Sequence, residues 1–483
     1  MTAEARPFNK LNWAALALAG LAFATCANTL GHGFVADDFD WIVSNDAVRD
    51  IGTAWRAFTG GQINNRVFRP IPLAWFTLDY VVARHAAWFY HLENVLLHVA
   101  VTLLVYRLLR PLGSRAAWLA AAFFAVLPVH TEVVANVTSR SELLASALAL
   151  LALLELRRPL VAGFLLMTAM LSKETAVAVP VLALLLWFAA SGEGPADRLG
   201  RGSTLRRRVW TLTALLAGIV GYILLRLRAR CCVLFPLGSR SAELDNPLLM
   251  ADWPTRARTA MMIVGQNLGI SVAPYHLSAD YSYNQIPLIR SWLEPQFLLW
   301  ALLPVVLLGV ALFARRRHPN LLLGAGWFLV AIGPVSNLAF PIGTIRGERL
   351  LYLPSVGVCL LLGQMFAWLQ GSGRADRRRW AIGATALLLL ALGVRAADRN
   401  RVWESQDTLT AASLRDAPQS ARAHFQAGAL RLMAADCPGA VPHFRRALRI
   451  FPEYRMAISA LAACFASPGS SNERGQWPPP IRK

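Results

Sequence analysis

Long apolar runs separated by short arginine-bearing segments recur along this 483-residue chain, and no other feature restricts its fold as strongly. The runs lie at about 13–31, 94–109, 115–129, 142–156, 159–172, 174–190, 209–227, 293–313, 320–341, 350–369 and 380–397. About 20 apolar residues in a helix cross a bilayer, and the helix pairs its backbone groups internally. We therefore predict an all-α, polytopic membrane helix bundle with about eleven spans, of which those at 115–129, 142–156 and 159–172 are short.

The basic residues predict the orientation of this bundle. Cytoplasmic loops of membrane proteins are enriched in Lys and Arg. With residues 1–12 as a cytoplasmic tail, the inside segments carry Arg6 and Lys10, Arg107 and Arg110, Arg157 and Arg158, Arg198 and Arg201, Arg315–Arg317 and Arg377–Arg379. The run Trp13–Leu30 is then a retained signal anchor, and the C-terminus lies outside. The same distribution accounts for the net charge of +20, so we predict no nucleic-acid partner.

The polar segments divide the chain into domains. We predict a transmembrane domain at 13–397, with a first outer loop at 32–90 and a second large outer loop at 228–292. Any chemistry then faces the periplasm or a lumen. Arg outnumbers Lys 45 to 3, which favours a bacterial source and an inner membrane with a periplasmic C-terminus. In a eukaryote the corresponding place is the membrane of the endoplasmic reticulum, with a lumenal C-terminus.

A pair of adjacent carboxylates follows the first apolar run directly. Asp37 and Asp38 lie at the membrane surface, beside Phe34 and Phe39. Two close carboxylates at a low-dielectric boundary repel each other, which raises the pKa of one of them and suits it to act as a general base. The alternative is that both residues cap a short surface helix.

Further ionisable residues stand at the outer ends of the predicted spans. They are His91, His130, Glu132, Arg140, Lys173, Glu174, Arg346, Glu348 and Arg349. Ionisable groups at this depth usually face a bundle interior or a watery cavity. Arg346 and Arg349 suit a phosphate clamp, because guanidinium groups bind phosphate oxygens in a bidentate manner. The alternatives are helix capping and internal ion pairs, including a pair of Glu348 with Arg349 or Arg140.

The chain changes character after the last apolar run. In the window Ala421–Tyr454, Gly428, Ala440, Phe444, Ala447 and Pro452 occupy the positions expected of a tetratricopeptide repeat. We predict a tetratricopeptide-like helical domain at 398–466, outside the membrane, and a disordered tail at 467–483. One repeat with flanking halves is too short to be stable alone, so we expect it to pack on the membrane domain. Cys437 and Cys464 both fall outside and can form a disulfide, whereas the adjacent Cys231 and Cys232 are poorly suited to pair with each other.

Several of these motifs together resemble a known family. They are Phe34–Asp38, Arg69-Pro70, His91–His98, Pro128–Glu132, Ser139–Ala145, Ser172–Glu174, Gly347–Ser355 and the repeat at 421–454. In this order they resemble the TMTC-type (transmembrane and tetratricopeptide repeat) protein O-mannosyltransferases and their bacterial relatives, of the GT-C glycosyltransferase superfamily. The resemblance covers residues 30–455, approximately.

The resemblance implies a membrane enzyme that moves a sugar, mannose in this family, from a polyprenyl-phosphate donor to an acceptor hydroxyl with inversion. It implies an acidic base in the first outer loop, which maps onto Asp37 or Asp38; we favour Asp37, with Asp38 positioning the acceptor. Basic residues would hold the departing phosphate, namely Arg69, Lys173, Arg346 and Arg349. Such a transfer needs a lipid-linked donor and an acceptor protein, lipid or glycan.

Other functions stay open at this point. A transporter is disfavoured, because the charges cluster at outer span ends rather than at the midplane and no internal symmetry is evident. A non-catalytic membrane-anchored tetratricopeptide scaffold remains an alternative. No certain cofactor is indicated, but Asp37, Asp38, His91 and His130 can be combined into a divalent metal site.

Overall fold

The computed structural model describes residues 13–59, 67–189, 204–229, 240–371 and 373–466. Within these ranges the protein is all-helical and contains no strand. The N-terminal tail, Arg198, Arg201, Cys231, Cys232 and the predicted disordered tail lie outside the described residues.

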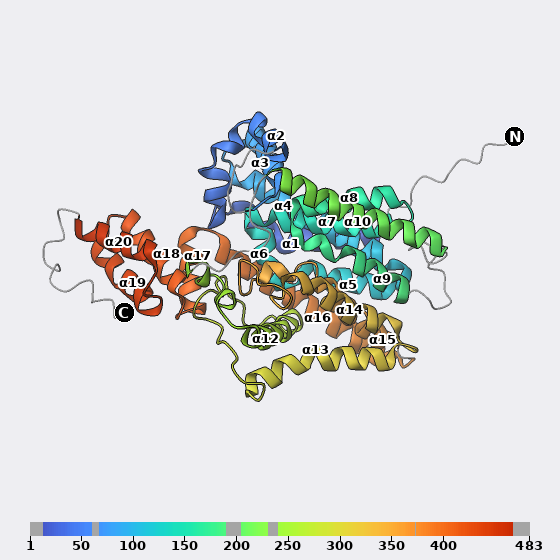
Figure 1. Cartoon of the computed structure of the whole chain (residues 1–483). Helices are drawn as coiled ribbons and strands as arrows, with labels where there is room; N and C mark the ends of the chain where they lie inside the picture. The colour runs from blue at the N-terminus through green and yellow to red at the C-terminus, as the bar shows by residue number, and fades with distance from the viewer. Residues whose placement is uncertain (1–12, 60–66, 190–203, 230–239, 372, 467–483) are drawn as a thin grey trace.

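The helices follow one another along the whole chain (Figure 1). The α-helices are α1 Trp13–Cys26, α2 Ile51–Thr59, α3 Pro70–Ala83, α4 Ala87–Leu109, α5 Ser114–Val126, α6 Thr131–Ala135, α7 Arg140–Leu154, α8 Pro159–Ser172, α9 Val179–Ala189, α10 Leu205–Arg228, α11 Arg240–Glu243, α12 Trp253–Val272, α13 Pro295–Ala314, α14 Pro319–Ile332, α15 Ser355–Gln370, α16 Ala375–Asn400, α17 Gln406–Asp416, α18 Ala421–Met433, α19 Cys437–Ile450 and α20 Arg455–Ala466. Short helical turns are η1 Ala27–Gly31, η2 Phe39–Val43, η3 Asp46–Arg49, η4 Arg110–Leu112, η5 Pro128–His130, η6 Val137–Ser139, η7 Glu174–Ala178, η9 Pro247–Leu249, η10 Gly333–Val335, η11 Glu348–Leu351 and η12 Arg401–Trp403.

Fewer helices are long and apolar enough to span a membrane than the eleven spans that the sequence predicts. Among the described residues, 6 helices are long and apolar enough to cross a membrane, or up to 7 if Ser114–Val126 and Pro128–Ala135, bent by 53°, form one span. Other apolar helices are shorter: α8 has 14 residues, or about 21 Å at 1.5 Å per residue, against a hydrocarbon core of about 30 Å. The count of eleven therefore stays a prediction, whereas the described residues confirm an all-helical fold with several helices long and apolar enough to span a membrane.

Several helices pack at very short range through small residues. An added Cβ on Gly218 of α10 would lie 2.3 Å from the carbonyl oxygen of Gly163 on α8, and one on Gly357 of α15 would lie 2.3 Å from that of Gly324 on α14. Small residues let membrane helices approach closely, and this approach supplies van der Waals contact where lipid provides no hydrophobic driving force. Outward faces are apolar instead: on α13, Leu299 is 67% exposed and Phe313 is 94% exposed, as expected of a helix that faces lipid.

The substitution Gly218→Val should lower the free energy of unfolding by about 1–3 kcal/mol, because the valine side chain would force α8 and α10 apart. The measurement is the thermal unfolding midpoint of purified protein in detergent. Gly383→Val is the matched control, since Gly383 also lies in a long helix but has no atom within 4 Å of an added Cβ. Equal midpoints for the two variants would contradict the close contact.

The segments predicted to lie outside meet at one end of the bundle. The backbone N–H of Thr138 donates to Asp38, that of Arg349 to Glu132, and that of Gly33 to the carbonyl of Glu404. Helices α17–α20 lie at this same end as α2 and α3 (Figure 1). These predicted outer segments therefore contact one another, whereas the division into domains and the side of the membrane that the segments face stay predictions.

The C-terminal helices pack on the rest of the protein, as expected. Ala421 donates its N–H to the carbonyl of Tyr283 at 3.0 Å, and Asn284 donates to that of Gln419 at 3.3 Å. Within this region α18 and α19 pack together, with Phe444 against Gly428. Cys437 and Cys464 form a disulfide between α19 and α20, a pairing that the sequence left open. The tetratricopeptide assignment itself stays a prediction.

Candidate active site

The two adjacent carboxylates of the first outer loop point in different directions. Asp38 is fully buried and accepts N–H groups from Val35 at 3.1 Å and from Thr138 at 2.8 Å. Asp37 is exposed and lines a pocket. Ala36, which precedes them, has φ 48°, a left-handed conformation that is uncommon for a residue with a Cβ. The position of Asp38 therefore differs from the prediction, because its oxygens bind backbone rather than face an acceptor.

Burial raises the pKa of Asp38 to about 7, whereas the nearby charge of Asp37 is the smallest contribution. The sequence correctly predicts that one carboxylate of the pair has a raised pKa, but the main cause is desolvation and not mutual repulsion. This group is held away from the pocket, so the raised pKa concerns folding more directly than catalysis.

The stability of the protein should consequently depend on Asp38 and pH. The unfolded chain releases this proton near its ordinary pKa of 3.8, whereas the folded protein holds it up to about 7. Between these values the unfolded state binds fewer protons, so stability falls as pH rises and then levels off above about pH 7. Unfolding midpoints from pH 5 to 8 should show a shallower decline for Asp38→Asn than for wild type. Equal slopes would contradict this assignment.

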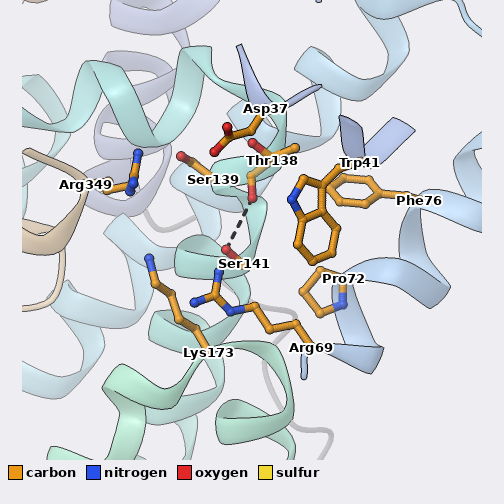
Figure 2. Close-up of a pocket in the computed structure, with 10 residues that line it drawn as sticks. All are labelled: Asp37, Trp41, Arg69, Pro72, Phe76, Thr138, Ser139, Ser141, Lys173 and Arg349. Atoms are coloured by element: carbon orange, nitrogen blue, oxygen red, sulfur yellow. Dashed lines mark hydrogen bonds between the residues drawn. The ribbon is translucent and has the colours of Figure 1, made fainter. Parts of the chain in front are cut away.

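The pocket contains about 470 Å³ of space free of protein atoms, part of it open to solvent. It is lined by Asp37, Trp41, Arg69, Pro72, Phe76, Thr138, Ser139, Ser141, Lys173 and Arg349. Figure 2 shows Asp37 on one side, Arg69 and Lys173 on the opposite side, and Arg349 on a third. Trp41, Pro72 and Phe76 form an apolar wall. One carboxylate thus faces three cations across one cavity.

Each cation of the pocket is held from behind by a carboxylate. Arg69 contacts Glu174 at 3.1 Å, Lys173 contacts Glu142 at 2.5 Å, and Arg349 contacts Glu132 at 2.7 Å. The backbone N–H of Arg349 also donates to Glu132 at 2.9 Å, which fixes the turn at η11. The charge of Glu132 raises the pKa of Arg349 further above its usual value. Glu132 and Glu174 therefore orient cations, as the ion-pair alternative expected.

Arg140 lies outside the pocket, contrary to the prediction that it binds substrate. Its side chain is fully buried and contacts Asp79, Glu93 at 2.9 Å, Asn94 at 2.8 Å and the carbonyl of Tyr90 at 2.8 Å. A guanidinium group can be buried when its donors are satisfied and its charge is paired. Arg140 therefore joins α3, α4 and α7 behind the apolar wall.

The two histidines also have structural partners. His91 lies against the carbonyl oxygen of Gly33 at 3.3 Å, and His130 contacts the hydroxyl of Ser355 at 2.8 Å and the carbonyl of Phe124 at 2.9 Å. Both rings are buried, and neither lines the pocket. Their predicted substrate contacts are therefore absent from the described pocket.

Arg346 and Glu348 belong to a second polar cluster. Arg346 donates to Asn267 at 2.9 Å and lies over the ring of Tyr281. Glu348 pairs with Arg399 at 3.2 Å, not with Arg349 or Arg140 as the sequence suggested, and burial raises its pKa to about 7. Arg346 thus does not join Arg349 in one phosphate clamp.

The pocket includes residues that the sequence argument did not select. Trp41, Phe76, Thr138, Ser139 and Ser141 come from three segments that meet only in the folded protein. The richness of the first outer loop in aromatic residues was visible in the sequence, but an interfacial belt explained it equally well.

The described residues contain no group of three or more His, Cys, Asp and Glu placed to hold a metal ion. In particular, Asp37, Asp38, His91 and His130 do not converge, because the last three are engaged with backbone or hydroxyl groups as described above. The structure therefore gives no support to the metal site that was considered from the sequence.

The fold and site define a multi-pass helical membrane protein with a charged pocket at one end of its bundle. Residues 240–308 match the family model described as "Protein O-mannosyl-transferase TMTC, DUF1736", and residues 69–225 match "Dolichyl-phosphate-mannose-protein mannosyltransferase". Arg69 and Lys173 fall inside the second match, whereas Asp37 and Arg349 lie outside both.

Curated relatives agree with these matches. The chain is 27% identical to Protein O-mannosyl-transferase Tmtc3 of Drosophila melanogaster over 88% of its length, 26% identical to TMTC1 of Mus musculus over 93%, and 29% identical to TMTC4 of Homo sapiens over 86%. The resemblance to the TMTC-type family is therefore confirmed. The chain spans 53%, 59% and 63% of the length of these three relatives.

Among solved structures, the protein is similar to ArnT from Cupriavidus metallidurans bound to undecaprenyl phosphate. The TM-score is 0.43 at 12% sequence identity, over 87% of this chain and 81% of the other.

Proposed function

We propose that this protein transfers a sugar, mannose by analogy with its relatives, from a polyprenyl-phosphate donor to an acceptor hydroxyl on the outer side of the membrane. The observation that carries the proposal is the pocket in which Asp37 faces Arg69, Lys173 and Arg349. The named activity of the TMTC relatives supports it, and so does the match to a mannosyltransferase family model. The GT-C type of fold is part of the same proposal.

In the proposed reaction Asp37 accepts the proton of the acceptor hydroxyl. The hydroxyl oxygen attacks the anomeric carbon of the sugar, the bond from this carbon to the phosphate oxygen breaks, and the phosphate leaves with the electron pair. Attack from the side opposite to the phosphate inverts the anomeric configuration. This geometry requires a base and an anion site on opposite sides of the sugar, which is how Asp37 and the cations are arranged.

The three cations stabilise the charge that develops on the leaving phosphate. Fixed donors do this well in a partly dehydrated site, since they need no reorganisation during the reaction. Lys173 and Arg349 are held by Glu142 and Glu132, so their side chains are already ordered before a donor binds.

The apolar wall suits the sugar ring and the start of the lipid chain. Trp41 presents a large ring beside Asp37, and the hydroxyls of Ser139 and Ser141 lie on the neighbouring wall (Figure 2). Binding sites of small molecules commonly combine an apolar lining with a few convergent polar groups.

Alanine in place of Trp41 should raise the KM for the donor about 10-fold, equivalent to about 1.4 kcal/mol of binding. The maximal rate should change less, because the base and the cations stay in place. Steady-state transfer at varied donor concentration measures both constants. Trp88→Ala, at an outer-end tryptophan that is 54% exposed and outside the pocket, should leave both unchanged. An unaltered KM in Trp41→Ala would remove this residue from the sugar site.

We further propose that the pocket faces the periplasm of a bacterium, with residues 398–466 on the same side. The basic segments at the other end of the bundle support this orientation, as does the Cys437–Cys464 disulfide, since such bonds persist in oxidising compartments.

The remaining candidate functions differ in the acceptor of the sugar. Protein acceptors follow from the named activity of the relatives, whereas a lipid or polysaccharide acceptor would leave the same pocket chemistry intact. A non-catalytic scaffold predicts that Asp37, Lys173 and Arg349 can be lost without consequence.

The test is sugar transfer in membranes that contain the protein and are supplied with radiolabelled polyprenyl-phosphate mannose. Label should enter a protein fraction with wild type. Label in lipid or glycan fractions would move the proposal to that acceptor class. If no fraction is labelled with this donor or with other polyprenyl-phosphate sugars, the enzymatic function is overturned.

A further inference from the structure

The loop that presents Asp37 is held from outside the membrane bundle, by the segment that begins the C-terminal helices. The N–H of Ala36 donates to the side-chain oxygen of Gln406 at 2.8 Å. The N–H of Gly33 donates to the carbonyl of Glu404 at 3.0 Å. These residues are separated by about 370 positions in the sequence and meet only through tertiary structure.

An apolar contact accompanies the two hydrogen bonds. Val35 packs in a buried cluster with Ala135, Trp403 and Leu409, of which the last two belong to η12 and α17. Three residues of the loop, Gly33, Val35 and Ala36, are therefore contacted by residues 403–409. The segment 403–409 lies immediately after α16, whose last residues contact the end of α1: Asn400 donates to the carbonyl of Thr25 at 3.1 Å.

The conformation of Ala36 explains why this support matters. At φ 48° the residue adopts a left-handed conformation, which persists in a non-glycine residue only when its surroundings hold it. Beyond this residue the two carboxylates separate, with Asp38 buried against Thr138 and Asp37 in the pocket. An ordinary conformation at Ala36 would change the direction of the chain and move Asp37.

We propose that Gln406 is a positioning residue, which keeps Ala36 in its left-handed conformation and thereby keeps Asp37 aimed into the pocket. This inference rests on the proposed function for its effect on catalysis, but the hold on the loop can be measured separately. In the described structure the side chain of Gln406 hydrogen-bonds to Ala36 and Thr410, and neither of these residues lines the pocket.

The orientation of the Gln406 amide has its own support. Its nitrogen donates to the hydroxyl of Thr410 one helical turn later, at 3.4 Å, which leaves the oxygen to accept from Ala36. The C-terminal helical region thus contributes to the geometry of the pocket and is not only an appended module.

The test uses the full-length protein in detergent and compares Gln406→Met with Gln406→Glu. Methionine has a similar length but cannot replace the amide oxygen as a strong acceptor, whereas glutamate retains an oxygen for the N–H of Ala36. Gln406→Met should lower kcat about 10- to 100-fold with little change in the KM for the donor, because misplacing a reacting group acts on the chemical step. Gln406→Glu should retain most of the activity.

Hydrogen–deuterium exchange supplies the readout that is independent of activity. The peptide covering residues 33–41 should exchange faster in Gln406→Met than in wild type and should remain slow in Gln406→Glu. Gln419→Met is the matched control, since the Gln419 side chain accepts from Arg446 at an exposed site of the same region. It should change neither exchange in this peptide nor kcat.

Three results would overturn the inference: unchanged exchange in Gln406→Met, faster exchange with unchanged kcat, or a raised donor KM without loss of kcat. If wild type transfers no sugar, the proposed function fails, and the exchange comparison still decides whether Gln406 holds the loop. If Gln406→Met does not fold, Gln406→Leu takes its place in the same comparison with Gln406→Glu. Residues 33–41 should then exchange faster and kcat should fall in Gln406→Leu, whereas both should stay near the wild-type values in Gln406→Glu.

Discussion

Replacing Asp37 with asparagine is expected to lower the rate of sugar transfer about 10²- to 10⁴-fold, because the amide cannot accept the proton of the acceptor hydroxyl. The folded protein should persist, since Asp37 is exposed and, within the described residues, its carboxylate takes part in no hydrogen bond or ion pair of the fold. Transfer of radiolabel from polyprenyl-phosphate mannose measures the rate. Donor binding should be retained, because Arg69, Lys173 and Arg349 are unchanged.

Asp38→Asn is the matched control for this experiment. It makes the same chemical change at the next residue, but it removes one of the two oxygens that accept the N–H groups of Val35 and Thr138. The expected result is a loss of stability of about 1–3 kcal/mol, with a smaller effect on transfer per folded molecule. If Asp38→Asn abolishes transfer in folded protein while Asp37→Asn retains it, the assignment of the base is reversed.

Loss of the Arg349 guanidinium should have the second largest effect. Arg349→Gln is expected to lower transfer about 10²- to 10³-fold, the range found when one fixed donor to a developing negative charge is removed. The 2.7 Å contact with Glu132 orders this side chain toward the pocket, so the wild-type group needs little rearrangement before the phosphate leaves. Initial rates at saturating donor measure the effect on the chemical step.

The ion pair requires a control of its own, because Arg349→Gln leaves the buried carboxylate of Glu132 without its charged partner. The double variant Glu132→Gln with Arg349→Gln removes both charges, and it should fold more stably than Arg349→Gln alone. Its transfer should be as low as that of the single variant. Recovery of transfer in the double variant would show that Arg349 serves only to neutralise Glu132.

That the protein is all-helical and multi-pass was predictable from the sequence, whereas its division into membrane and outer parts stays a prediction. Helices that cross lipid must be apolar along their length and must pair their own backbone groups, so their signal is local and strong. The helix pair at 421–454 was predicted from a different signal, the spacing of the small residues at which two helices touch, and in the structure Gly428 allows Phe444 to approach. The lengths of individual spans were less predictable, since turns such as that at Pro128 interrupt apolar runs without changing their composition.

The residues of the site could also be selected from sequence motifs, but their roles could not be predicted from the sequence. Lys173 and Arg349 were selected together with Arg140 and Arg346 as basic residues at outer span ends, and Arg69 was added through the family resemblance. Only packing distinguishes them. Arg140 is enclosed by α3, α4 and α7, and Arg346 contacts Asn267, whereas the other three reach one cavity.

The sequence by itself determined that this is a helical membrane protein, which of its segments gather at one end of the bundle, and that adjacent carboxylates stand at that end. These properties depend on hydropathy, charge and spacing along the chain. The tertiary structure decided which carboxylate faces the pocket, which glutamates hold the cations, and that Gln406 contacts the loop of Asp37. A contact between residues 370 positions apart depends on how helices pack against one another, and no local sequence pattern predicts it.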